Sequence, residues 1–231
     1  MKLLALDTSS IACSVALQIG DEVTTRHEEQ PREHTRLLLP MINGLLDEAG
    51  ITPSDLDSIV LGNGPGSFVG MRIAASVAQG LAFASALKIV PVSSMAAVAA
   101  RVLAGDDVDE VVVTQDAHMQ QVYLGIYAPG NDGLPVERVP ERLHDLVAID
   151  DLAPRSEATR FAAGYGWQRY PELLVANRDR IATVSEVLYP HARDLLPLAT
   201  VALGDGQAVD PQDIVPTYLR QKVAEKPAPI S

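Results

Sequence analysis

Apolar residues along the chain follow the spacing expected of alternating strands and helices. Residues 2–8 predict a largely apolar strand that ends in Asp7 and Thr8, and residues 13–19 predict a second strand. The pair Gly20-Asp21 after the second strand is typical of a hairpin turn. The chain therefore begins with an antiparallel pair in which a carboxylate lies at the end of the first strand.

The remainder of the first half predicts three further strands and three helices. In order, these are a polar strand at 22–29, a helix at 34–49 closed by Gly50, a buried strand at 58–61, a helix at about 69–86, a short strand at 88–91 and a helix capped near Ser93 or Ser94. The order β-β-β-α-β-α-β-α defines a first α/β domain, which we place at residues 1–104.

The second half repeats the opening pattern. After the acidic linker at 105–110, an apolar strand ends in Asp116 and a second strand follows at 121–128 with nearly the same spacing. This favours a duplicated domain, although apolar strands ending in Asp are common enough for coincidence. We place a second, degenerate α/β domain at 105–231. Its later part predicts helices broken at Pro190 and Pro197, and a flexible tail from about residue 225.

Composition narrows the class of protein. The 231 residues carry a formal net charge of −12, which argues against a free-standing nucleic-acid binder. The uncharged run at 73–87 falls short of the ~20 residues that span a bilayer, so a cytoplasmic protein without membrane attachment is expected. The single cysteine, Cys13, excludes an internal disulfide and a Cys-based zinc site. No two histidines are four residues apart, so the usual helical zinc motifs are absent.

A glycine-rich loop at residues 62–70 lies between a predicted strand and a predicted helix. Such a loop can bind an anion with the free amides of the helix N-terminus, or it can be a tight turn stiffened by Pro65. It lacks the Lys-Ser/Thr ending of a Walker A loop and the G-x-G-x-x-G spacing. Both the turn and the phosphate site remain open at this stage.

Two equivalent strand ends are candidates for phosphate chemistry. Asp7, Thr8, Ser9 and, in the second half, Asp116 could hold a nucleotide and its metal between two domains. Alternatively, these polar groups only satisfy loop amides at the ends of buried strands. We therefore treat them as possible vestigial nucleotide loops.

The helices predicted at 34–49 and about 69–86 carry apolar or small residues around most of their circumference, so another element must cover each helix on both sides. The alternatives are burial beneath the second domain and a helix–helix interface with another subunit, and we favour the interface. The expected contact residues are Thr35, Leu38, Met41, Ile42, Leu45, Met71, Ala74, Ala75, Ala78 and Ala82.

Five segments resemble the TsaB (YeaZ) family, whose members take part in making threonylcarbamoyladenosine in tRNA. They are residues 4–10, 32–35, 64–73, 116–117 and 216–220, and the Gly-Pro-Gly-Ser-Phe block at 64–68 is the most specific of them. The resemblance implies the actin/Hsp70/sugar-kinase (ASKHA) fold, with two related α/β domains and a reduced second one. It also implies that the C-terminal segment packs back on the first domain.

The resemblance further implies a subunit without catalytic activity. In the paralogous transferase TsaD, two histidines of an H-x-x-x-H motif hold a metal, and Ser94 and Val98 stand at the matching positions here. Neither residue replaces imidazole as a ligand, so no metal site, no catalytic residue and no glycoprotease activity are expected. No cofactor is expected to be required, and ATP with Mg²⁺ is expected only within a complex.

The function implied is that of a scaffold that binds and activates TsaD, with the ATPase TsaE completing the complex. The chain alone is expected to form a homodimer through the same surface. Contact with tRNA is expected to be indirect. The alternative is an active ATP-dependent phosphotransferase of the same fold that uses Asp7 and Asp116 around Mg²⁺.

Overall fold

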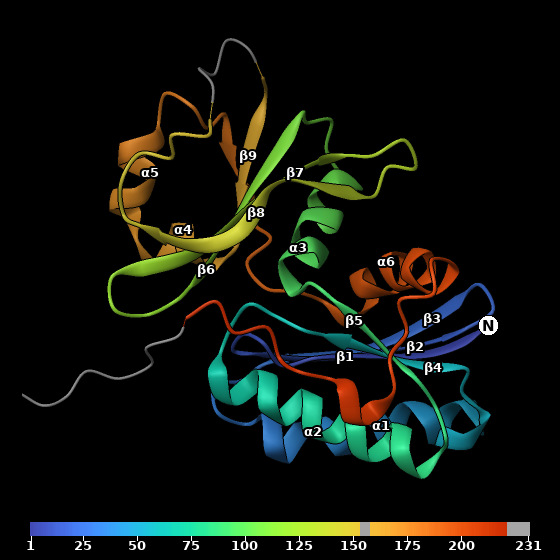
Figure 1. Cartoon of the computed structure of the whole chain (residues 1–231). Coiled ribbons are helices and arrows are strands. Elements are labelled where there is room, and N and C mark those ends of the chain that lie inside the picture. Colours follow the sequence, from blue (N-terminus) through green and yellow to red (C-terminus); the bar gives the residue numbers. More distant parts are fainter. Residues whose placement is uncertain (153–157, 221–231) are drawn as a thin grey trace, which may run out of the picture.

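The computed structural model describes residues 1–152 and 158–220 and consists of two lobes, each built on a five-stranded mixed sheet (Figure 1). In lobe 1 the strand order is β3-β2-β1-β4-β5. These strands are β1 (Lys2–Asp7), β2 (Ala12–Ile19), β3 (Glu22–Glu29), β4 (Ser58–Gly62) and β5 (Ile89–Val92). The tail predicted from residue 225 lies outside the described residues.

Lobe 2 repeats this topology. Its strand order is β10-β9-β6-β7-β8, formed by β6 (Glu110–Asp116), β7 (Gln121–Pro129), β8 (Pro135–Asp145), β9 (Arg160–Ala163) and β10 (Thr183–Val184). In both sheets the first strand pairs antiparallel with the second and parallel with the fourth. The two sheets therefore match strand for strand, which confirms the predicted fold of two related α/β units.

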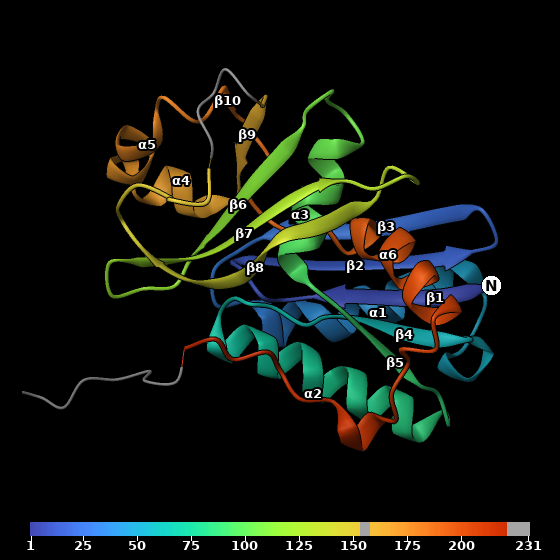
Figure 2. The same cartoon turned by 45° about the horizontal axis from the view of Figure 1, so that its top comes forward.

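Helices cover both faces of the lobe 1 sheet, because alternate residues of each central strand are apolar on opposite faces. Leu4 and Leu6 pack beneath α1 (His34–Ala49) and α2 (Phe68–Ala84), whereas Leu3 and Ala5 pack against α6 (Ala192–Gly204). A one-turn helix, η1 (Pro53–Asp55), precedes β4. Figure 1 shows α6 above the sheet and α2 below it, and in the turned view of Figure 2 α6 lies in front of the strands.

Lobe 2 has a smaller helical cover. Helix α3 (Ser94–Leu103) packs on one face of its sheet, and the short α4 (Tyr165–Arg169) and α5 (Pro171–Asn177) pack on the other. The boundary predicted after residue 104 falls in the segment that joins α3 to β6.

The C-terminal segment returns to lobe 1. Helix α6 packs on β1, β2, β4 and β5, and the one-turn helix η2 (Pro211–Asp213) packs on α2. The prediction that Pro197 breaks the helix is wrong, because α6 is continuous from Ala192 to Gly204. Burial of Leu195, Leu196 and Ala199 in the lobe 1 core outweighs the hydrogen bond that proline cannot donate.

Candidate functional site: a sealed strand end, an interlobe cavity and a helical surface

The glycine loop between β4 and α2 packs directly on the turn after β1. A Cβ atom at Gly66 would lie 2.2 Å from the Ser9 carbonyl oxygen, and one at Gly70 would lie 1.9 Å from the Thr8 carbonyl oxygen. The Ser67 amide donates to the Ser9 carbonyl (2.6 Å), and the Thr8 hydroxyl donates to the Gly70 carbonyl (2.7 Å). Backbone of this chain occupies the space that an anion would need, so the geometry supports the tight turn and not the phosphate site.

Asp7 is closed off from solvent at the end of β1, with 1% of its surface exposed. Its Oδ1 accepts from the amide and the hydroxyl of Ser9 (2.8 Å each), and its Oδ2 accepts from the Ser94 hydroxyl (2.5 Å). A Cβ atom at Gly62 would lie 1.9 Å from Oδ2. Burial raises the pKa of Asp7, although the hydrogen bonds from Ser94 and Ser9 oppose this. Both carboxylate oxygens are engaged, so Asp7 is not placed to hold a metal-bound phosphate.

Ser94 lies at the first position of α3 and connects three elements. Its hydroxyl donates to Asp7 and accepts from the Gly64 amide at 3.2 Å. Val98, one turn further on, lies in the apolar core between α3 and the lobe 2 sheet. No group of three or more His, Cys, Asp or Glu side chains suited to a metal ion occurs in residues 1–152 and 158–220.

Asp116, the equivalent residue of lobe 2, is more open. Its side chain is 18% exposed, and its Oδ1 accepts from the His118 amide (2.8 Å) and the Tyr170 hydroxyl (2.9 Å). Its Oδ2 lies 3.2 Å from Nδ1 of His118. The structure therefore places the two aspartates in different surroundings and does not bring them together around one ligand.

A cavity of about 680 Å³ lies between the lobes. Lobe 1 contributes the turn at Ser9 and Ser10, the start of α1 and the start of α2, and lobe 2 contributes Asp116 and Tyr165. Thr35 and Val69 also line this cavity, so it opens beside the N-terminal ends of both helices. Of the four residues predicted as vestigial nucleotide loops, only Ser9 and Asp116 line it.

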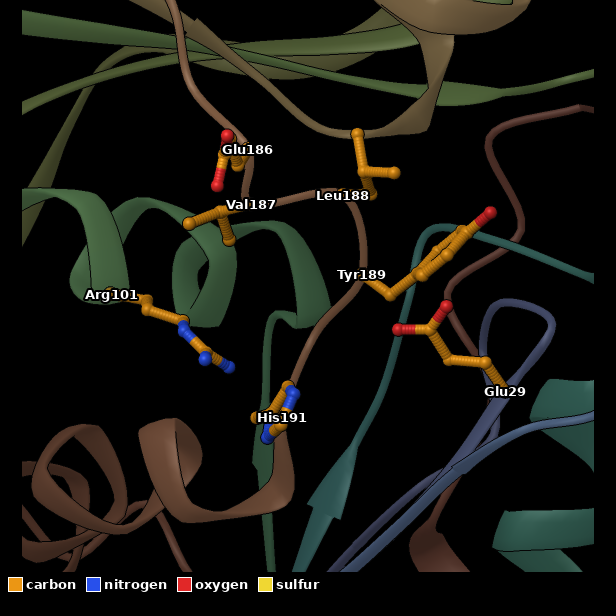
Figure 3. Close-up of a pocket in the computed structure, with 7 residues that line it drawn as sticks. All are labelled: Glu29, Arg101, Glu186, Val187, Leu188, Tyr189 and His191. Atoms are coloured by element: carbon orange, nitrogen blue, oxygen red, sulfur yellow. The ribbon is translucent and has the colours of Figure 1, made fainter.

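A second, smaller hollow of about 340 Å³ lies on the other side of Tyr189, which lines both spaces. Figure 3 shows Arg101 of α3, Glu29 at the end of β3 and His191 before α6 around it. The His191 ring stacks on His27 with 3.5 Å between ring centroids. Burial, followed by the nearby His27 and Arg101, lowers the pKa of His191 to about 3. Burial lowers the pKa of His27 as well, so both imidazoles favour the neutral form. Sequence reasoning missed this pair because the two residues are far apart in the chain.

Most of the predicted partner residues on α1 and α2 point into the core of this chain and not towards solvent. The prediction is wrong for those that are buried in the core of this chain, because each helix must first cover its own sheet. These are Leu38, Ile42, Leu45, Met71, Ala74, Ala75, Ala78 and Ala82. Met41 is half-buried against the same core, and Thr35 is exposed.

The outward faces of α1 and α2 carry a different set of residues. The large apolar side chains that are solvent-exposed there include Leu39 (45%), Val69 (64%) and Phe83 (80%). Ser76 and Gly80, between Val69 and Phe83, are exposed as well. We call these five residues the α1–α2 surface. Helical spacing from Val69 could have identified Ser76, Gly80 and Phe83, because they lie on one side of a 3.6-residue turn.

Comparison with known proteins identifies the family. The family model described as TsaD, tRNA N6-adenosine threonylcarbamoyltransferase, matches residues 23–228. The tRNA threonylcarbamoyladenosine biosynthesis protein TsaB of Escherichia coli K12 is 33% identical over 229 residues, which cover 99% of each chain. The protein of the same name from Bacillus subtilis 168 is 28% identical over 97% of this chain and 96% of its own.

Solved structures agree with these matches. A Pseudomonas aeruginosa protein described as similar to peptidase YeaZ has a TM-score of 0.87 at 38% identity and covers 95% of this chain and 99% of its own. A structure described as YeaZ from Pseudomonas aeruginosa has a TM-score of 0.83 at 38% identity, with 94% and 99% covered. No helix among the described residues is long and apolar enough to cross a membrane. The full-length relatives, the YeaZ structures and the shared fold show that the chain belongs to the TsaB (YeaZ) family.

Proposed function

We propose that this chain acts in the biosynthesis of threonylcarbamoyladenosine in tRNA as a non-catalytic subunit that binds a TsaD-type transferase. The relatives' names support the pathway. The observation that carries the docking role is the α1–α2 surface, where Phe83, Val69 and Leu39 remain exposed although both helices already cover their own sheet. Large exposed apolar side chains on neighbouring elements are typical of protein–protein contact sites.

The non-catalytic role is supported by the sealed strand end. Asp7 has no free carboxylate oxygen, because Ser9 and Ser94 donate to both. Ser94 and Val98 supply no imidazole at the positions where the transferase family holds its metal. We therefore propose that this subunit requires no cofactor of its own, has no glycoprotease activity, and meets ATP and Mg²⁺ only within the complex.

The remaining partners follow from the same proposal. A TsaE-type ATPase completes the complex, and a homodimer forms through the α1–α2 surface when the transferase is absent. The net charge of −12 supports only indirect contact with tRNA, because phosphate binding needs clustered basic side chains.

The docking role is tested by co-elution of the chain with the transferase subunit of the same organism. Phe83→Glu places a charge in the apolar contact, and we expect it to abolish co-elution and homodimer formation while the melting temperature stays unchanged. Val175→Glu is the matched control, because Val175 is a 67% exposed valine on α5 of lobe 2. Retained co-elution of the Phe83→Glu variant contradicts the assigned surface.

The pathway is tested separately by depleting the protein and measuring tRNA nucleosides by mass spectrometry. We expect threonylcarbamoyladenosine to fall and to be restored by the wild-type chain and by the Val175→Glu variant, but not by the Phe83→Glu variant. Unchanged nucleoside levels after depletion contradict the pathway, whatever the co-elution shows.

One observation favours the phosphotransferase alternative: the interlobe cavity is large and Asp116 lines it. Calorimetry with ATP and Mg²⁺ on the purified chain separates the two functions. Binding that Asp116→Ala abolishes favours the enzyme, and no measurable binding favours the scaffold.

A further inference from the structure

The last described residues of the chain connect the two lobes without belonging to either sheet. After η2, residues 214–220 run along α2 towards the turn between β6 and β7 (Figures 1 and 2). We call this segment the clasp. It is the third crossing between the lobes, after the β5–α3 connection at Ser93 and residues 185–191.

The clasp is anchored in lobe 1 by apolar packing and by the glycine loop. Ile214 is 6% exposed and lies in the core formed by α1, α2 and their sheet. Nδ2 of Asn63 donates to the Val215 carbonyl at 3.1 Å and lies 3.3 Å from the Thr217 hydroxyl. The loop that packs on the β1 end therefore also holds the start of the clasp.

A cluster of two aromatic rings and an arginine fixes the middle of the clasp to the first turns of α2. Nε of Arg72 donates to the Tyr218 hydroxyl at 2.8 Å. The Arg72 guanidinium lies 3.7 Å from the centre of the Phe68 ring, which is 5.3 Å from the Tyr218 ring. A cation over an aromatic face is stabilising, so Tyr218 is held in a defined position.

The end of the clasp is anchored in lobe 2. Leu219 packs against the core between α3 and the lobe 2 sheet. The Arg220 guanidinium donates to the Gln121 side-chain oxygen (2.7 Å) and to the His118 carbonyl (3.2 Å). Both bonds come from Nη2, and Nη1 lies 3.5 Å from the Met119 sulfur, so the guanidinium holds the turn through two nitrogens where lysine offers one.

The turn that Arg220 binds is conformationally costly. His118, Met119 and Gln120 all have positive φ angles (58°, 52° and 58°), which non-glycine residues adopt at an energetic cost. Such a turn persists only where its surroundings hold it, and the bond from Arg220 to the His118 carbonyl is one of those supports.

The geometry points to the clasp as a latch that sets the separation of the lobes. Two covalent crossings still allow one lobe to rotate against the other about the line that joins the crossings. A third attachment away from that line prevents this rotation. The β5–α3 connection enters lobe 2 beside β8, where the Ser93 hydroxyl donates to Glu141, whereas Arg220 binds the turn between β6 and β7. The five Cα-to-Cα steps from Ile214 to Leu219 span at most about 18 Å, so the intact clasp limits opening of the interlobe cavity.

The latch also lies next to the α1–α2 surface, and this extension rests on the proposed function. Phe68 precedes Val69 directly, and Phe68 and Tyr218 are both partly exposed. A transferase docked on α2 would therefore contact the clasp and bind most tightly to the conformation in which the clasp is attached to both lobes. By linkage, opening the latch would then weaken docking by the same factor by which docking favours the latched state.

The latch is tested on the full chain without any partner, by distance measurement between two spin labels. Ser54→Cys and Ala176→Cys place one exposed label on each lobe, and the native Cys13 is buried and protected from labelling. We expect Arg220→Ala to lengthen and broaden the distance distribution, Arg220→Lys to shift it in the same direction, and Arg178→Ala to leave it unchanged. Arg178 is the matched control because its side chain is 78% exposed on lobe 2.

A second variant keeps the test decisive if Arg220→Ala lowers the melting temperature below that of the measurement. Asn63→Ala removes the side-chain hydrogen bonds that hold the start of the clasp on lobe 1 and should also lengthen the distance. Distributions identical to the wild type for both variants overturn the latch. Because no transferase is present, that outcome leaves the docking proposal intact, and failure of docking by the wild-type chain leaves the latch intact.

Discussion

The turn after β1 and the turn after β6 occupy equivalent places in two sheets of the same strand order, yet they have different environments. Asp7 is closed off by Ser94, Ser9 and the nearby Gly62, whereas Asp116 lines the interlobe cavity. The difference comes from what packs on each turn: a glycine loop and a long helix in lobe 1, and the short α4 in lobe 2. A duplicated topology therefore does not preserve a duplicated site.

The largest expected effect breaks the packing that closes the lobe 1 turn. Gly70→Ala places a Cβ atom 1.9 Å from the Thr8 carbonyl, and such overpacking costs about 1–3 kcal/mol of unfolding free energy. Gly80→Ala in the same helix is the matched control, because nothing lies within 4 Å of its Cβ position. Removing an exposed mid-helix glycine should stabilise the fold by roughly 0.5–1 kcal/mol. Chemical denaturation of both variants measures the difference, and equal stabilities contradict the close packing.

The second comparison removes the hydroxyl that each aspartate receives from another element, and we expect a smaller difference in unfolding free energy between its two variants. Ser94→Ala leaves Oδ2 of the buried Asp7 and the Gly64 amide without their partner, at a cost of about 1–3 kcal/mol. Tyr170→Phe removes the corresponding hydroxyl from Asp116, whose Oδ1 keeps the His118 amide, so we expect a cost of about 0.5–1.5 kcal/mol.

Urea unfolding at neutral pH ranks these two variants. If Tyr170→Phe lowers the unfolding free energy as much as Ser94→Ala does, the proposed difference between the two strand ends is wrong, because both would then depend equally on their hydroxyl partner.

The smallest effect concerns charge at the sealed turn. Burial raises the pKa of Asp7 above its ordinary value of 3.8, so the folded state favours the protonated form. The stability that this carboxyl contributes is complete below that ordinary value and is lost as pH rises through the raised pKa.

Asp7→Asn should therefore be at least as stable as the wild type at neutral pH, and its advantage should shrink as pH approaches 3.8 from above. Urea unfolding at several pH values measures this, with Asp116→Asn as a control for the loss of one negative charge. An advantage that grows towards low pH contradicts the sign of the shift.

Local sequence patterns predicted the elements of lobe 1 and the first two strands of lobe 2, but they did not predict β8, β10, α4 or α5. The continuous apolar run Leu3–Leu6 and the turn at Gly20 give β1 and β2 with their antiparallel pairing, and the glycine at residue 50 ends α1 in a left-handed conformation. These features depend on neighbours in the chain, which is why they are readable. The continuity of α6 through Pro197 was not readable, because it depends on packing against a sheet formed from residues 2–92.

The candidate site divides in the same way. Asp7, Ser94 and the glycine loop were all noticed as motifs, but their mutual hydrogen bonds join residues 87 and 30 positions apart. The predicted partner residues on α1 and α2 were chosen for apolar character, which core and interface residues share, so most of them proved to be core. Phe83 and Val69 needed the structure to show which side of α2 faces solvent.

By itself, the sequence determined the elements of lobe 1, the strands that open the repeat in lobe 2, and the family, because these depend on local propensity, periodicity and short motifs. The tertiary structure decided three things: that Asp7 is sealed while Asp116 is open, that the outward residues of α1 and α2 differ from the apolar ones, and that Arg220 connects the lobes. Each depends on contacts between distant segments. Burial and hydrogen bonding are properties of the assembled neighbours, and no window along the chain contains them.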